Sequence, residues 1–314
     1  MKSYSSEKIR IPANDGRMIH TLVLRHRQDS ALSAEPSIGI LWLHGGGYKM
    51  GFPSLVYISA AMDLLKKFNV TVFVPRYRLS GKAPYPAALN DAYDTLLYMK
   101  ENAERLRIRK SQIMVGGESA GGGLTAALCI YARDVRENRI QAPLPDGRSA
   151  PQRPLGKVNI AYQIPLYPMI DDRDTETNKN NNGKVWNTKK NRAAWLKYLR
   201  STYPAEIMKA SEAERPKMVP AVSVPPYAAP ARLTDYHGLP PCYTFVARGE
   251  AFYAETLSFV EHLKAAGVPA IVDVHEVSEH AFDEPPRGKP EAMKARELLV
   301  RQFEYASTHY FAEN

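Results

Sequence analysis

Hydrophobic residues along the chain follow two different periods. Residues 7–25 alternate between polar and apolar side chains around the turn sequence Asn14-Asp15-Gly16, a pattern that predicts a β-hairpin. From residue 38 onward, short runs that are apolar throughout follow one another, as is typical of parallel strands buried on both faces. The stretches between these runs carry apolar residues three and four positions apart, which indicates helices that pack one face against a sheet.

Strand and helix patterns alternate along most of the chain. Strands are predicted at residues 39–43, 70–74, 112–115, 158–166, 242–247 and 271–277. Helices are predicted from Pro86 as the first helical residue, at residues 120–135, before Gly267 and near the C-terminus. Repeated strand and helix units of this kind predict an α/β fold with a mostly parallel central sheet and helices on both faces.

Two segments interrupt the alternation. Residues 141–157 contain four prolines and predict an exposed loop. Residues 171–238 are longer, are largely helical in pattern around residues 186–203, and lie between two predicted core strands. Because ligands bind at the strand ends of open α/β sheets, we interpret this insert as a helical lid. No repeat or linker divides the chain, so we expect residues 1–314 to form one domain with residues 171–238 inserted in it.

Composition excludes several classes of protein. Of the 314 residues, 44% are hydrophobic, which is enough for a core and argues against intrinsic disorder. No run approaches the roughly 18 apolar residues that a membrane helix needs, and the polar residues 1–8 predict no signal peptide. Cys129 and Cys242 are too few for a disulfide framework or a cysteine metal site. Two reduced thiols favour a cytoplasmic protein.

The chain carries 42 basic and 33 acidic residues, a net charge of +9. Much of the local surplus lies at residues 174–200, in an Asn-rich stretch without a nucleic-acid-binding motif. We therefore favour a solvated face over a surface that binds polyanions, and expect neither nucleic acid nor a membrane as partner.

The strongest chemical signal is Gly117-Glu118-Ser119-Ala120-Gly121, which fits the GxSxG pattern between a predicted strand and a predicted helix. A serine on this tight turn is held in a strained conformation with its hydroxyl exposed above the sheet. Ser119 is therefore the candidate nucleophile. The alternative is a glycine-rich turn without chemistry.

A second glycine run, His44-Gly45-Gly46-Gly47, follows the strand at residues 39–43 directly. Backbone N–H groups in such a loop can stabilise the alkoxide that forms when a serine attacks an ester carbonyl. The alternative is a phosphate-binding loop, but neither the Gly-Lys-Ser/Thr sequence nor GxGxxG spacing is present. We expect His44 itself to hold the loop by a hydrogen bond.

A serine nucleophile needs a base and an acid that orients it. Of the eight histidines, His280 is the one expected in the loop between the last strand and the last helix, within reach of the carboxyl edge of the sheet. The acid is expected after the strand at residues 242–247, where Glu250 lies in the turn and Glu255 already lies in the helix. We favour Glu250. The alternatives are a solvent-exposed His280 and a Glu250 that serves only as a helix N-terminal acid.

Together these motifs resemble the ordered signature of the hormone-sensitive-lipase-like carboxylesterases. The resemblance runs from about residue 40 to residue 310 and also includes Arg76-Tyr77-Arg78-Leu79 and His280-Ala281-Phe282. It implies an α/β-hydrolase fold, cleavage of short acyl esters, and no metal or organic cofactor. By the same resemblance, Gly46, Gly47 and Ala120 provide the oxyanion N–H groups, with Gly45 shaping the loop and His44 and Glu118 in supporting positions.

The chain departs from this family at three places. Glu118 stands where aspartate is usual, Glu250 lacks the usual aspartate-proline pair after it, and the N-terminal lid helices are largely missing. We therefore expect the insert to form the acyl pocket. Its aromatic residues Trp186, Trp195 and Tyr198 either line that pocket or belong to the insert's own core.

We accordingly expect a serine carboxylesterase that hydrolyses short- to medium-chain acyl esters, acetyl esters included, through an acyl-enzyme. The substrate is a small uncharged ester. The alternatives are a carbohydrate or amide deacetylase with the same three residues, a non-catalytic small-molecule receptor on the same scaffold, and a module that binds polyanions through its basic segment. The sequence does not decide between a monomer and a homodimer.

Overall fold

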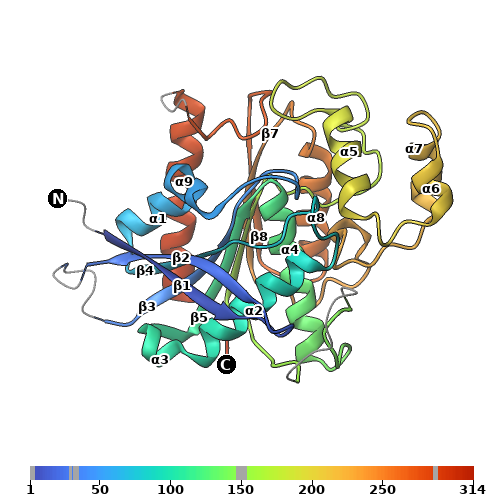
Figure 1. Ribbon diagram of the computed structural model, residues 1–314. Coiled ribbons are helices and arrows are strands. Elements are labelled where there is room, and N and C mark those ends of the chain that lie inside the picture. The colour runs from blue at the N-terminus through green and yellow to red at the C-terminus, as the bar shows by residue number, and fades with distance from the viewer. Residues whose placement is uncertain (1–3, 28–29, 31–34, 146–153, 286–288) are drawn as a thin grey trace.

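The structure, a computed structural model, describes residues 4–27, 30, 35–145, 154–285 and 289–314. At its centre lies an eight-stranded sheet with the order β1-β2-β4-β3-β5-β6-β7-β8 (Figure 1). The strands are β1 (Tyr4–Pro12), β2 (Met18–His26), β3 (Ser37–Leu43), β4 (Val70–Pro75), β5 (Ile108–Glu118), β6 (Tyr162–Leu166), β7 (Cys242–Ala247) and β8 (Ala270–His275).

The first two strands form the predicted hairpin, and β2 adds to the sheet antiparallel to β4. Every later pairing, from β4 through β3 to β8, is parallel. The mostly parallel α/β sheet predicted from the sequence is thereby confirmed. Because β3 to β8 run in one direction, the loops that follow them meet at one edge of the sheet.

Helices cover both faces of the sheet (Figure 1). The helices of the core are α1 (Ala61–Lys67), α2 (Ala87–Glu101), α3 (Ala103–Leu106), α4 (Ala120–Arg136), α8 (Tyr253–Ala265) and α9 (Pro290–His309), with a 3₁₀ turn η2 (Pro53–Ile58). Successive side chains of a strand point to opposite faces. In β3, Leu41 and Leu43 accordingly pack in the cluster with α2, α4 and α8, whereas Ile40 and Trp42 pack in the cluster with α1 and α9.

Element boundaries show where the hydrophobic pattern was wrong. The strand predicted to begin at residue 158 begins at Tyr162, although Val158 and Ile160 are buried. The backbone N–H of Asn159 donates to the side chain of Asn314 at 2.7 Å, so this apolar stretch is not part of the sheet ladder. Burial alone does not distinguish a strand from other buried extended chain.

Other predicted elements differ less. The last strand ends at His275 rather than at residue 277, and Pro86 precedes its helix instead of opening it. In the loop predicted at residues 141–157, residues 146–153 lie outside the described residues. The remainder of that loop contains no helix or strand, as predicted.

Residues 171–238, here called the insert, connect β6 to β7. Their elements are α5 (Thr188–Tyr198), α6 (Ala205–Lys209), α7 (Arg215–Met218), η3 (Val219–Ala221) and η4 (Pro230–Arg232). Asn187 caps α5 by accepting a hydrogen bond from the backbone N–H of Lys190 at 3.0 Å. In Figure 1 the insert lies beside the carboxyl ends of the strands, with α6 and α7 farthest from the sheet.

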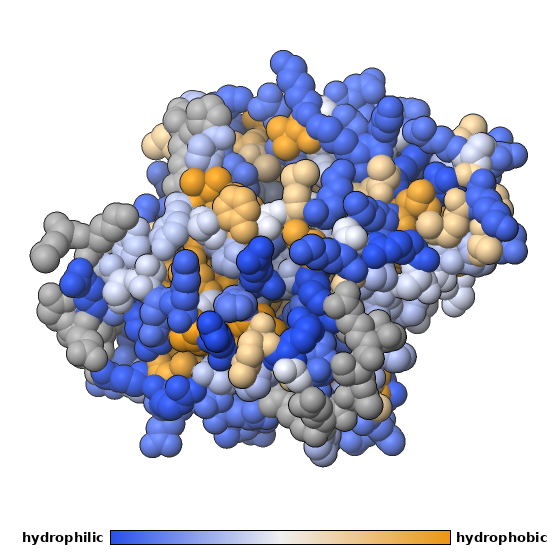
Figure 2. All heavy atoms as spheres, in the orientation of Figure 1, coloured by the Kyte–Doolittle hydropathy of each residue, from blue (hydrophilic) through white to orange (hydrophobic). Residues whose placement is uncertain are grey.

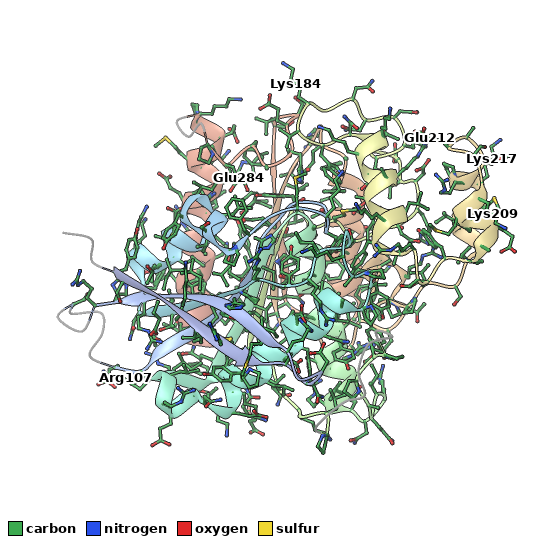
Figure 3. The ribbon with its side chains drawn as sticks, in the orientation of Figure 1. Arg107, Lys184, Lys209, Glu212, Lys217 and Glu284 are labelled. Carbon is green, nitrogen blue, oxygen red and sulfur yellow. The ribbon has the colours of Figure 1, made fainter. Side chains whose placement is uncertain are left out.

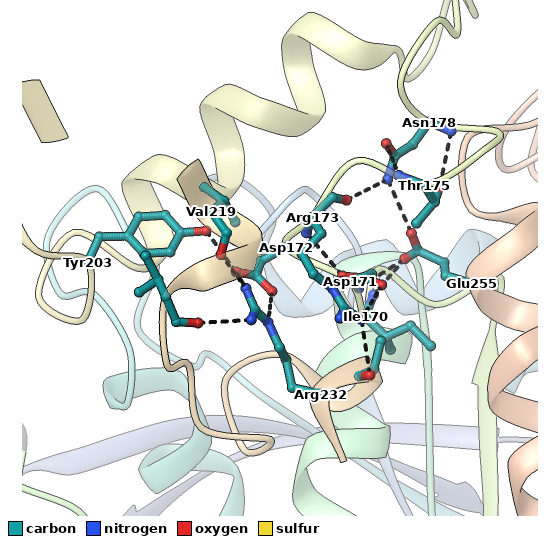
Figure 4. A network of polar contacts seen from close by, with 12 residues as sticks. Ile170, Asp171, Asp172, Arg173, Thr175, Asn178, Tyr203, Val219, Arg232 and Glu255 are labelled. Atoms are coloured by element: carbon teal, nitrogen blue, oxygen red, sulfur yellow. Dashed lines mark hydrogen bonds and ion pairs between the residues drawn. The ribbon is translucent and has the colours of Figure 1, made fainter. Parts of the chain in front are cut away.

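A polar network joins the beginning of the insert to its end (Figure 4). The guanidinium of Arg232 donates to both oxygens of Asp172, at 2.7 and 2.8 Å, and also to the backbone carbonyl of Val219. The hydroxyl of Tyr203 donates to Asp172 at 2.9 Å. Paired, charge-assisted bonds of this geometry are the strong ones in proteins, so they fix the path of the insert.

Charged side chains of the insert lie on the surface. The face in Figure 2 is mainly hydrophilic, with hydrophobic residues in small separate groups. Lys184, Lys209, Glu212 and Lys217 extend away from the body of the protein (Figure 3), and all four are exposed. No helix in the described part of the chain has the length and hydrophobicity required to span a membrane.

Candidate active site

Ser119 lies in the sharp turn between β5 and α4, with φ of 56° and ψ of −118°. A positive φ is uncommon for a residue with a side chain and must be held by its surroundings. The backbone N–H of Ser119 donates to the carbonyl of Leu166 at 3.0 Å, and its carbonyl accepts from Gly123 and Met169 at 2.9 and 3.0 Å. These three bonds hold the strained turn that the GxSxG pattern predicts.

The end of β3 packs directly against this turn. A Cβ placed on Gly121 would lie 1.9 Å from the carbonyl oxygen of Leu43, so no larger residue fits there. A Cβ on Gly45 would lie 3.5 Å from Cβ of Ser119 and 3.2 Å from the carbonyl oxygen of Glu118. The glycine run after β3 and the serine turn after β5 are therefore in contact.

The structure brings His280 and Glu250 to the serine. Nε2 of His280 lies 2.8 Å from Oγ of Ser119, and Nδ1 faces a carboxylate oxygen of Glu250 in a short contact. His280 is in the loop between β8 and α9, and Glu250 is in the turn between β7 and α8. With Nδ1–H donating to Glu250, Nε2 is free to accept the serine proton.

All three residues are buried, and burial raises the pKa of the Glu250 carboxyl while the facing His280 imidazole lowers it. Three aromatic rings enclose that imidazole. Tyr167 and Phe252 meet it edge to face, with centroids 5.1 and 5.0 Å away, and Trp186 of the insert lies 6.3 Å away. The exposed fractions are 7% for Ser119, 5% for His280 and 8% for Trp186, so little water surrounds the serine and the imidazole.

Glu255, the alternative acid, lies elsewhere. Its buried carboxylate accepts backbone N–H bonds from Ile170 at 2.8 Å and from Asp171 at 3.3 Å (Figure 4). Burial raises the pKa of this carboxyl well above its ordinary value, and the charge of Asp171 adds to the rise. Glu255 thus fixes the first residues of the insert, and Glu250 is the glutamate that contacts His280.

The predicted oxyanion residues lie around the serine turn. Gly46 and Gly47 have φ of 121° and 59°, in the region that favours glycine. Ala120 is the first residue of α4, where a backbone N–H has no acceptor within its own helix. A Cβ on Gly47 would lie 2.3 Å from the ring of Trp186, so the insert covers this loop directly.

His44 holds the glycine loop as expected. Its Nδ1–H donates to the carbonyl of Gly45 at 2.8 Å, and its ring stacks on Tyr77 with centroids 4.3 Å apart. The hydroxyl of Tyr77 donates to the carbonyl of His44 at 2.7 Å. Burial lowers the pKa of His44 to about 4, so the ring is neutral at pH 7.

Glu118, next to the serine, contacts the segment between η2 and α1. Its carboxyl accepts the backbone N–H of Ala60 at 2.9 Å. Burial raises the pKa of Glu118 to about 8, and the carboxylate of Glu284 adds to the rise while Arg296 opposes it. The protonated form of this carboxyl is therefore favoured, and the carboxyl links the serine turn to the segment before α1.

The three aromatic residues of the insert occupy two different places. Trp186 contacts the glycine loop and faces His280, whereas Trp195 and Tyr198 are buried against Tyr48, with Tyr198 stacked on it at 4.0 Å. Sequence reasoning missed Tyr167 and Phe252 as neighbours of His280. Their positions directly after β6 and after Glu250 are the signal that could have identified them.

No cluster of three or more histidine, cysteine or acidic side chains suited to a metal ion occurs among the described residues. The polar groups gathered at the serine are instead those of nucleophilic acyl transfer.

The sequence profile of the α/β hydrolase fold family matches residues 40–284. The chain belongs to this family, and the resemblance to hormone-sensitive-lipase-like carboxylesterases is confirmed at the level of the family. Among solved structures, bacterial heroin esterase superposes with a TM-score of 0.79 at 25% identity, covering 97% of this chain and 85% of that one.

Curated relatives include esterase LipI of Mycobacterium tuberculosis, 27% identical over 75% of this chain and 62% of its own length. Ethyl acetate hydrolase of Pseudomonas putida is 24% identical over 87% of this chain and 74% of its own length. For the first three relatives matched, the alignments span 56%, 26% and 62% of the relative's length. The chain therefore matches less than two thirds of the length of each of these three relatives.

Proposed function

We propose that this protein is a serine carboxylesterase that hydrolyses small, uncharged acyl esters of short to medium chain length through an acyl-enzyme. The observation that carries the proposal is the 2.8 Å contact between Oγ of Ser119 and Nε2 of His280, on a strained turn, with Glu250 behind the imidazole. Esterases among the relatives and solved structures support it.

The first half of the reaction acylates the serine. Oγ of Ser119 attacks the ester carbonyl while Nε2 of His280 takes the hydroxyl proton, and Glu250 stabilises the imidazolium. The negative charge that develops on the carbonyl oxygen is stabilised by the backbone N–H groups of Gly46, Gly47 and Ala120, each worth about 10²- to 10³-fold in rate. His280 then gives its proton to the departing alcohol.

The second half repeats these steps with water. His280 removes a proton from the water as it attacks the acyl-enzyme, and the acid leaves when Oγ recovers its proton. The aromatic enclosure of His280 supports this scheme because hydrogen bonds and charges act more strongly where water is scarce.

The insert acts in this proposal as the lid within a single domain. Its Trp186 covers the glycine loop, and the network around Asp172 and Glu255 fixes its two ends. The substrate in this proposal is an uncharged ester, because aromatic rings surround the imidazole of His280 and glycines lie beside Ser119. We keep the cytoplasm as the proposed compartment, since both cysteines are free and buried.

The test is hydrolysis of p-nitrophenyl acetate together with labelling by a fluorophosphonate. The wild-type protein should show a burst of nitrophenol and be labelled, whereas Ser119→Ala should lose about 10⁴-fold or more in kcat and all labelling. Ser258→Ala, at an exposed serine of α8, is the matched control and should behave as wild type. A wild-type protein that is neither labelled nor active would instead point to a receptor.

A further inference from the structure

Trp186 occupies a position between the glycine loop and the imidazole. Its six-membered ring lies against Gly47, where a Cβ would come within 2.3 Å of Cη2. The ring centroid is 6.3 Å from that of His280 and 6.2 Å from that of Phe252. The indole therefore forms a wall that extends from the glycine loop toward the base.

This wall is held from two directions. The indole Nε1–H donates to Oδ1 of Asn191 at 3.3 Å, and Asn191 is itself buried on α5. The ammonium of Lys49 lies 5.9 Å from the ring centroid, a cation–π distance. Because the ring is anchored to α5 and covered by Lys49, a substrate group that overlaps with it cannot simply displace it.

The direction of proton transfer decides which part of an ester faces this wall. A general acid must lie within hydrogen-bond reach of the atom that it protonates. His280 protonates the leaving alcohol, so the alcohol lies on the imidazole side of the carbonyl carbon and the acyl chain extends away from it. Trp186, which faces the imidazole, therefore borders the alcohol.

We propose that Trp186 limits the size of the alcohol portion of the ester and not that of the acyl portion, in contrast to the acyl pocket that the sequence led us to expect from the insert. The inference rests on the proposed esterase function and adds a specificity-determining residue to it. It follows from the position of the ring, from the anchoring by Asn191 and from the side on which His280 releases its proton.

Two matched ester series separate the alcohol from the acyl group. In the first, ethyl acetate is compared with cyclohexyl acetate; in the second, ethyl acetate is compared with ethyl cyclohexanecarboxylate. Trp186→Ala should raise kcat/KM for cyclohexyl acetate, relative to ethyl acetate, by about 10-fold or more. The ratio in the second series should stay within about 2-fold of wild type. Dividing each value by that of wild type cancels the intrinsic reactivity of the esters.

The rate of deacylation separates an effect on the alcohol portion from a general disturbance of the site. All acetate esters yield the same acetyl-enzyme once the alcohol has left, so Trp186→Ala should change its hydrolysis by one factor common to both acetates, and the difference between them should appear only in acylation. Tyr203→Phe is the matched control, because it weakens the network of the insert at Asp172 without removing the indole. Its two ester ratios should equal those of wild type.

Several outcomes would overturn the inference. These are an equal change in both series, a change in the acyl series alone, or a Tyr203→Phe variant with the same gain on cyclohexyl acetate. If Trp186→Ala fails to fold, as judged by near-ultraviolet circular dichroism, Trp186→Phe replaces it, and an unchanged alcohol ratio in that variant overturns the inference. A wild-type protein inert to esters and fluorophosphonate defeats the proposed function as well, whereas a labelled, active protein with unaltered ratios defeats this inference alone.

Discussion

Gly47→Ala tests the contact between the glycine loop and the insert. The added Cβ would lie 2.3 Å from the ring of Trp186, where carbon atoms in favourable contact lie about 3.5 to 4.0 Å apart. Either the ring or the loop must therefore move by more than about 1 Å. The φ of 59° adds a backbone cost of about 1 to 2 kcal/mol for any residue with a side chain.

The magnitude follows from what the loop does in the proposed mechanism. A displacement of about 1 Å in a reacting group costs on the order of 10²-fold in rate. Loss of one oxyanion donor costs about 10²- to 10³-fold. We therefore expect Gly47→Ala to lower kcat/KM for ethyl acetate by about 10²- to 10³-fold. Its free energy of unfolding should fall by at least the 1 to 2 kcal/mol of backbone strain.

The double variant Gly47→Ala/Trp186→Ala isolates the clash. Without the indole, the new methyl group has space, so kcat/KM should recover at least about 10-fold over Gly47→Ala, a coupling of about 1.4 kcal/mol in a double-mutant cycle. Gly267→Ala is the matched control, because Gly267 also has a positive φ, of 75°, but a Cβ there would meet nothing within 4 Å. That variant should lose stability and keep wild-type kinetics.

The assay is pH-stat titration of acid release from ethyl acetate, with urea unfolding of each variant. Two results would refute the reasoning. One is a Gly47→Ala variant with wild-type kcat/KM, since the loop would then tolerate the methyl group. The other is a double variant as slow as Gly47→Ala, because the loss would then come from the backbone and not from the contact with Trp186.

Three further predictions concern the buried glutamates. The pKa of Glu118 is about 8 in the folded protein, against an ordinary value of 4.5. Between these two pH values the folded protein binds the proton and the unfolded chain does not. The free energy of unfolding should therefore fall as pH rises through this window, by about 1.4 kcal/mol per pH unit at most. Glu118→Gln should reduce the slope of stability against pH in urea unfolding from pH 5 to 8.5 by this contribution, and equal slopes in both proteins would contradict the assignment. Glu250→Gln should lower kcat by about 10³- to 10⁴-fold at nearly unchanged stability, because the imidazole loses its charged partner. Glu255→Ala should instead lower the free energy of unfolding by about 1 to 3 kcal/mol, because the backbone N–H groups of Ile170 and Asp171 lose their acceptor, while kcat changes little. A larger loss of kcat in Glu255→Ala than in Glu250→Gln would mean that the roles of the two glutamates are exchanged.

Much of the fold could be predicted because its signals are local. A strand apolar on both faces, a helix with one apolar face and a glycine turn each depend on a few consecutive residues. The strand β7, for example, has the predicted bounds, Cys242–Ala247. The local pattern gave a wrong strand boundary where a buried segment is not paired in the sheet, as at Val158, which is buried but lies before β6.

The candidate site was predictable in its parts because each candidate follows a strand. Parallel strands bring their carboxyl ends to one edge, so Ser119, Glu250 and His280 were expected near one another. Chain order allowed both Glu250 and Glu255, and Glu250 was favoured only because it was expected in the turn after the strand, with Glu255 already in the helix. Only the packing of α8 against the insert directs Glu255 to the backbone of Ile170 and leaves Glu250 on His280.

The sequence by itself therefore determined the alternation of strands and helices, the strained serine turn, the glycine loop and the order of the three candidate residues. The tertiary structure decided which glutamate meets the imidazole, which tryptophan of the insert covers the glycine loop, and that burial raises the pKa of Glu118. The physical reason is the distance along the chain over which each effect acts. Periodicity and turn chemistry act over a few neighbouring residues, whereas side-chain contacts and desolvation depend on segments that lie more than a hundred residues apart in the chain, as Gly47 and Trp186 do.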